Sequence, residues 1–232
     1  MRGLAVIALA GCTGVPRVKP VERHATPLAG AMLAVPGETM EFEVKLRGIR
    51  VGLVQTAVGW PGVVDDHRAV IVRSRGKTDG LLQLLGDLTW ELSSTVDIDS
   101  GVPLDDHEEA WADFAGQKEH HESHHRWDDG DHRHDIHTAV TAIRGWHSSP
   151  GARTELEVEI GGGHFDAAMW HVGRAMAVHQ PAIRYDGIAA DEFPFSAWVS
   201  DDASRVPLRF VVQTKFGEIS VELVDYQIPS DR

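Results

Sequence analysis

The chain has 232 residues, a formal net charge of −13 and 42% apolar residues. This negative charge argues against binding nucleic acid or an anionic membrane surface, because both attract positively charged proteins. No apolar run approaches the roughly 18 residues that a membrane-spanning helix requires. We therefore expect a globular body with its own core and no nucleic-acid partner, while cationic partners and metal ions stay open.

The N-terminus carries a short apolar segment that ends at the only cysteine. Residues 4–10 are apolar, and Cys12 closes the run Leu9-Ala10-Gly11-Cys12. This run resembles the lipobox of bacterial lipoproteins, in which the signal peptide is cut before the cysteine and the thiol is acylated. The resemblance implies a signal peptide over residues 1–11 and a membrane partner reached through a lipid on Cys12. Thr13, which is not acidic, follows the cysteine and favours the outer membrane, with the protein facing the periplasm.

A proline-rich segment follows the cysteine. Four prolines lie between residues 12 and 37 with no sustained periodicity, and such segments behave as semi-rigid spacers. We interpret residues 12–37 as the lipidated cysteine and a tether. A β-rich domain is expected over residues 38–226, followed by a short tail over 227–232.

Alternating apolar and charged residues predict strands from Glu38 onward. Phe42, Val44 and Leu46 alternate with charged residues, which is typical of a half-buried strand. A second strand is expected to end at Val58, and further strands are predicted over residues 69–74, 89–98, 156–160, 208–215 and 218–224. The run Gly161-Gly162-Gly163 predicts a hairpin turn.

Helical signals are few. Residues 135–146 are expected to form a helix, because Asp135 suits the N-cap and an apolar stripe recurs at three- and four-residue spacing: Ile136, Val140, Ile143 and Trp146. A shorter helix is predicted over residues 80–85. The fold class is therefore mainly β: a single antiparallel rolled sheet, or a β-roll or half-barrel, with one or two short helices.

Three phrases together resemble one known family. They are Arg47-Gly48-Ile49-Arg50-Val51-Gly52, the phrase over residues 94–103, and a closing phrase that runs from Trp198 to Glu218. In this order and spacing they resemble domain of unknown function 3108, across about residues 38–226. The resemblance implies a bacterial cell-envelope protein with an antiparallel β-roll-like body and no established activity. The chain departs from the family pattern in its many central histidines.

A histidine-rich segment supplies candidate metal ligands. Imidazoles and the neighbouring carboxylates are ligands that zinc, copper and nickel accept. If residues 119–127 form a strand, His121 and His125 share one face with Trp127, and two further histidines share the other. The remaining three can converge with one of these pairs. The seven candidates are His120, His121, His124, His125, His132, His134 and His137. The alternatives are a solvated polar hairpin and a pH sensor.

Two hydrolase motifs are matched in part. The run His121-Glu122-Ser123-His124-His125 fits the HExxH pattern, in which two histidines bind zinc and the glutamate is the general base. On a helix these histidines share one metal, but on a strand they lie about 13 Å apart. No apolar stripe supports a helix here. Residues 131–137 are similar to the histidine box of metallo-β-lactamase-like hydrolases, but the spacing differs.

The sequence therefore predicts a lipid-anchored envelope protein of unknown molecular function that acts as a non-catalytic binding or scaffolding module. We identify no catalytic residue. An apolar ligand on a concave sheet face, or another envelope protein, is the expected partner. The first alternative is a metal-binding or metal-sensing lipoprotein that uses residues 120–137. The second is a zinc-dependent hydrolase. No cofactor is specified beyond zinc, copper or nickel as candidates.

Overall fold

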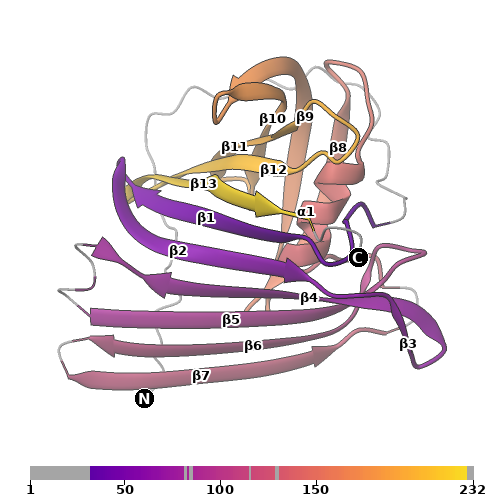
Figure 1. Ribbon diagram of the computed structural model, residues 1–232. Helices are drawn as coiled ribbons and strands as arrows, with labels where there is room; N and C mark the ends of the chain where they lie inside the picture. Colours follow the sequence, from indigo (N-terminus) through magenta and orange to yellow (C-terminus); the bar gives the residue numbers. More distant parts are fainter. Residues whose placement is uncertain (1–31, 81–82, 84–85, 115, 129–130, 229–232) are drawn as a thin grey trace.

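The computed structural model describes residues 32–80, 83, 86–114, 116–128 and 131–228. Thirteen strands and one helix lie within these residues (Figure 1). In chain order they are β1 (Thr39–Leu46), β2 (Ile49–Val58), β3 (Gly62–Val64), β4 (His67–Thr78), β5 (Gly86–Asp97), β6 (Pro103–Phe114), β7 (Gln117–Arg126), α1 (Ile136–Gly145), β8 (Arg153–Ile160), β9 (Gly163–Ala177), β10 (Gln180–Ala189), β11 (Phe193–Ser200), β12 (Pro207–Thr214) and β13 (Gly217–Gln227).

All strands belong to one antiparallel sheet. Its order is β7-β6-β5-β4-β2-β1-β13-β12-β11-β10-β9-β8, with β3 paired to β4 beside this path. The sheet rolls, but its end strands β7 and β8 do not pair, so the roll is open. This confirms the predicted fold class. The helix expected over 80–85 falls mainly outside the described residues. No described helix has the length and apolarity needed to cross a bilayer.

The core lies on the inner face of the sheet, defined here as the face against which α1 packs. One apolar cluster covers strands β8 to β11 and includes the buried side chains of Trp146, Met169 and Tyr185. A second cluster joins Met40 of β1 to strands β9, β10, β12 and β13. A third lies on β2, β4 and β5. Most of the buried apolar residues therefore belong to the second half of the chain.

The helix α1 begins where the sequence predicts, because the Asp135 carboxylate caps it by accepting the Thr138 backbone N–H at 2.7 Å. Its buried face differs from the expected apolar stripe. Val140 is 37% exposed, whereas the buried residues of the helix are polar or charged: His137, Thr138, Thr141 and Arg144. This face has polar partners outside the helix. Hydrogen bonds and an ion pair, together with apolar contacts, therefore hold the helix against the sheet.

An ion pair at the end of α1 is fully enclosed. Arg144 is 1% exposed and Glu38 is 0% exposed. The Arg144 guanidinium donates from Nη1 to Glu38 Oε1 at 2.5 Å and from Nη2 to Glu38 Oε2 at 3.2 Å. The Tyr226 hydroxyl also donates to Glu38 Oε2, at 3.0 Å. This bidentate pair ties the helix to the residue that precedes β1.

Side chains join the two end strands of the roll. His125 of β7 lies 3.2 Å from the Glu159 carboxylate of β8, measured between Nδ1 and Oε1. Arg133 also donates to Glu159, at 2.6 Å, and its guanidinium stacks over Trp127. The backbone of His134 forms a parallel bridge with Val158 and covers the free edge of β8. The segment between β7 and α1 thus connects the two end strands, β7 and β8, which do not pair with each other.

Candidate functional site

The outer face of the sheet, opposite α1, carries two polar rows that run across the strands. Directly opposed residues of antiparallel strands point to the same side, so the pairing register defines each row. The first row crosses seven strands at Asp225, Glu41, Gln55, Arg75, Glu91, Glu109 and Glu122. The second row crosses the same strands at Gln227, Thr39, Ala57, Arg73, Ser93, His107 and His124.

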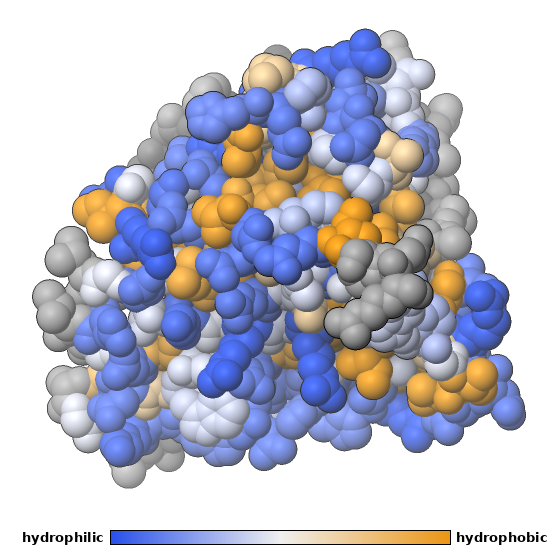
Figure 2. All heavy atoms as spheres, in the orientation of Figure 1, coloured by the Kyte–Doolittle hydropathy of each residue, from blue (hydrophilic) through white to orange (hydrophobic). Residues whose placement is uncertain are grey.

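A groove of about 770 Å³ follows these rows from β13 to β6. Its lining contains five carboxylates and two guanidinium groups, together with His107. Figure 2 shows that hydrophilic side chains predominate over the part of the molecule that carries β4 to β7, while apolar side chains gather nearer the upper strands. The groove therefore offers mainly polar and acidic contacts.

The two arginines on the groove floor differ in their partners. Arg75 pairs with Glu91 at 3.1 Å between Nε and Oε1. Arg73 is exposed and forms no ion pair with the residues that the structure describes. Glu41 accepts a hydrogen bond from the Gln55 amide at 2.8 Å. The five groove carboxylates are half-buried or exposed.

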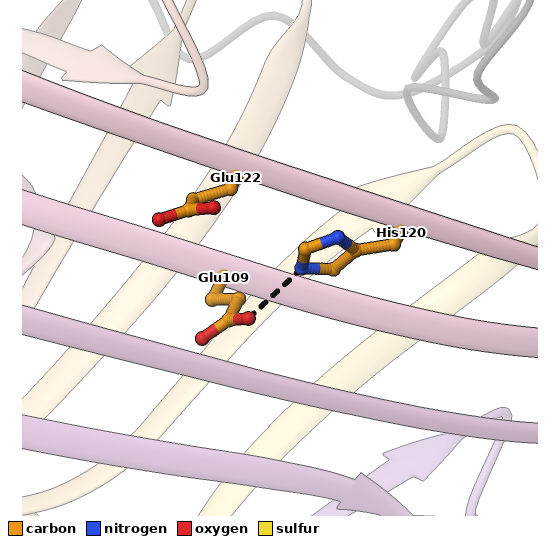
Figure 3. Close-up of side chains that lie close together, drawn as sticks. All are labelled: Glu109, His120 and Glu122. Atoms are coloured by element: carbon orange, nitrogen blue, oxygen red, sulfur yellow. Dashed lines mark hydrogen bonds and ion pairs between the residues drawn. The ribbon is translucent and has the colours of Figure 1, made fainter.

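At the β6 end of the groove, where His107 and Glu109 belong to its lining, β6 and β7 bring together imidazoles and carboxylates. Glu109, His120 and Glu122 each offer a ligand atom, and these atoms lie within 4.8 Å of one another. Figure 3 shows the His120 ring directed at the Glu109 carboxylate, with Glu122 beside them. His120 Nε2 lies 2.9 Å from Glu109 Oε1, and His107 Nε2 lies 3.2 Å from Glu122 Oε1. We call these four residues the β6–β7 cluster.

Neighbouring rings and strands hold the β6–β7 cluster in place. The His120 ring stacks on Trp111, with centroids 5.5 Å apart and planes inclined by 19°. His124 lies beside His107 and bonds Asp105 at 2.5 Å. The side chains of the cluster remain 28–59% exposed, so an ion from solvent can reach them.

Two of the predicted histidines face the other way. His121 and His125 lie on the inner face, because residues of a strand alternate between its sides. The ring of His125 contacts Trp127, with centroids 4.7 Å apart. Since residues 117–126 form a strand, the HExxH histidines are about 13 Å apart along it, and Glu122 points away from both. This arrangement does not match the helical zinc site of peptidases.

The histidines near α1 are spread over different environments. His132 is exposed, whereas His134 and His137 are buried. His137 places Nε2 at 2.8 Å from Ser74 Oγ and Nδ1 at 2.6 Å from Ser94 Oγ. Burial lowers the pKa of His137 to about 4, and burial also lowers the pKa of His134. Both imidazoles are therefore neutral near pH 7.

The contacts between His137 and the two serines superficially resemble a nucleophile and its base. A working base needs a free or carboxylate-oriented second nitrogen and access to substrate. Here serines occupy both nitrogens, and Ser94 is 0% exposed while His137 is 5% exposed. We therefore assign this group to the attachment of α1 on the sheet.

Sequence reasoning did not select two members of the β6–β7 cluster. His107 and Glu109 lie on β6, more than ten residues before His120. The available signal was the period-2 pattern of Asp105, His107, Glu109 and Trp111, which places these polar and aromatic side chains on one face. The predicted lipidation residue, Cys12, lies outside the described residues.

Comparison with known proteins supports the fold. No known protein family and no curated protein matches the sequence. The structure is similar to a β-barrel-like protein of domain of unknown function DUF1849 from Brucella abortus, with a TM-score of 0.57 and 8% identity over 85% of this chain and 99% of that chain. A candidate lipoprotein from Parabacteroides distasonis is more distant, with a TM-score of 0.34 and 6% identity over the same shares. The chain thus has the fold of a β-barrel-like domain of unknown function, and the specific resemblance to domain of unknown function 3108 is not confirmed.

Proposed function

We propose that the protein is a lipid-anchored component of the bacterial cell envelope that binds a ligand without catalysis, and that the outer-face groove is its binding surface. The observation that supports this proposal is the groove itself, which spans six neighbouring strands and is lined by charged side chains along its length. A rigid sheet that presents such a surface can bind without rearrangement. The anchor at Cys12 would keep this surface close to a membrane.

The lining of the groove favours a polar, positively charged ligand, whereas the sequence predicts an apolar ligand on a concave sheet face. The lining residues include five carboxylates but only two guanidinium groups, so acidic groups outnumber basic ones. The whole chain also carries a net charge of −13, so long-range attraction would assist a cationic ligand. We propose an extended segment that carries several amino groups, such as a lysine-rich stretch of another envelope protein.

A labelled lysine hexamer tests the ligand class. Binding is measured by fluorescence anisotropy at low salt, using the full chain with Cys12→Ser. The Glu41→Gln/Glu91→Gln variant should bind about fivefold more weakly, which corresponds to roughly 1 kcal/mol for exposed charges. Glu155 and Glu157 lie on β8, away from the groove lining. Their double glutamine variant makes the same charge change and should bind as the unmodified chain does. If both variants lose the same affinity for the hexamer, the loss reflects the net charge of the chain and not the groove.

Membrane fractionation tests the anchor separately. The native chain should sediment with the membranes and partition into detergent, whereas Cys12→Ser should stay in the aqueous fraction. A protein that behaves identically with and without the thiol would remove the anchor from the proposal and leave the groove untouched.

A further inference from the structure

We propose that His107, Glu109, His120 and Glu122 form a binding site for a divalent transition-metal ion of the group zinc, copper and nickel, with zinc as the probe. The site lies on the outer face of β6 and β7, at the end of the groove, and it combines two imidazoles with two carboxylates. This metal site does not depend on the proposed ligand of the groove, because it is inferred from its own donor atoms alone.

The geometry needs little change to accept an ion. Ligand atoms of Glu109, His120 and Glu122 already lie within 4.8 Å of one another, and His107 contacts Glu122 at 3.2 Å. Zinc binds nitrogen and oxygen at about 2.0–2.2 Å in a tetrahedral arrangement, so its ligand atoms lie about 3.4 Å apart. Small rotations of the exposed Glu109, His120 and Glu122 side chains would close that difference, and His107 would join them through its contact with Glu122.

The charges of the cluster also favour a cation. Glu109 and Glu122 are directly opposed across β6 and β7, and like charges in this position destabilise a sheet. A bound dication replaces that repulsion with attraction to both carboxylates. β7 is an end strand of the sheet and pairs only with β6. The same ion would therefore strengthen the attachment of β7 to β6.

The donor set selects among metals. Magnesium and calcium prefer sites made of oxygen atoms, whereas imidazole suits zinc, copper and nickel. Two imidazoles in a set of four therefore favour the transition metals. The stacking of His120 on Trp111 fixes the orientation of that ring, which lowers the ordering required when the ion binds.

Zinc affinity is the direct test. The full chain with Cys12→Ser, free of any polyhistidine tag, is titrated with zinc against a chromophoric chelator. His120→Gln/Glu122→Gln should weaken binding by at least about tenfold, and His107→Gln should weaken it less. His121→Gln is the matched control, because this neighbouring histidine faces the inner side of the same strand. It should leave the affinity unchanged.

Trp111 provides a second readout that reports position. Copper or nickel bound beside the stacked His120 should quench Trp111 fluorescence, and Trp111→Phe should remove the quenched component while the zinc affinity persists. Equal zinc affinity in the unmodified chain and in His120→Gln/Glu122→Gln, or a loss in His121→Gln as large as in that double variant, would overturn the proposal. Circular dichroism of each variant verifies that the fold is retained.

Discussion

The two faces of strands β4 to β7 use the same kinds of side chain in opposite ways. On the inner face, His137 lies between Ser74 and Ser94 and is 5% exposed. On the outer face, His107 and His120 contact carboxylates and have side chains that are 43% and 49% exposed. Desolvation holds the buried imidazole neutral and satisfied, whereas the exposed imidazoles keep access to solvent ions. Burial and hydrogen-bond partners, not residue type, therefore decide which histidines can bind a metal ion.

The largest expected effect breaks the buried ion pair. Arg144→Met leaves the Glu38 carboxylate enclosed without its partner, and we expect a loss of about 3–5 kcal/mol in the free energy of unfolding. Urea denaturation at pH 7 measures it. Arg75→Met is the control on the outer face, because Arg75 and Glu91 are 66% and 47% exposed; it should cost no more than about 1 kcal/mol. Comparable losses would contradict the distinction between the faces.

The next largest effect concerns pH. Burial lowers the pKa of His137 to about 4 in the folded protein, while an unfolded histidine titrates near its ordinary value of about 6.5. Between these values the unfolded chain binds more protons, so stability is lost as pH falls from about 6.5 to about 4. This group accounts for roughly 3 kcal/mol at most. His137→Gln should flatten the pH dependence of urea midpoints in this window, and His132→Gln, at an exposed position, should preserve it.

A smaller effect should follow the addition of zinc. Binding to the folded state alone raises the free energy of unfolding by about 2.7 kcal/mol at a free zinc concentration one hundred times the dissociation constant. Thermal unfolding with and without zinc measures this gain. His120→Gln/Glu122→Gln should show little of it, whereas His121→Gln should show all of it. Stabilisation that is the same in all three proteins would place the ion elsewhere.

The smallest expected effect sharpens the charge argument on the outer face. Without metal at pH 8, Glu122→Gln removes the repulsion between Glu122 and the directly opposed Glu109. We expect the variant to be more stable by a few tenths of a kcal/mol. Differential scanning calorimetry of matched samples checks the sign. A clear loss of stability would mean that the contact with His107 outweighs the repulsion.

The sequence predicted the sheet, its first and last strands and the limits of α1, because each has a strong local pattern. Strands β3, β6, β9, β10 and β11 were not predicted. β6 carries acidic residues on both of its faces and therefore lacks the alternation of apolar and polar residues that marks a half-buried strand. The buried polar face of α1 also escaped prediction, because its partners Glu38, Ser74 and Ser94 are distant in sequence.

The histidine segment shows the same limit for the site. Period-2 alternation correctly separated His121 and His125 from His120 and His124. It could not select His107 and Glu109, because pairing of β6 with β7 is a property of the folded sheet. Nor could it show that serines on β4 and β5 enclose His137.

The most direct test of the central claim, that the outer face of β6 and β7 binds a metal ion, is an anomalous difference map from crystals soaked in zinc. One strong peak is expected about 2.0–2.2 Å from nitrogen and oxygen ligands of His120, Glu109 and Glu122. A peak between His132 and His134, or none at the β6–β7 cluster in crystals where the four side chains are ordered and free of lattice contacts, would contradict it.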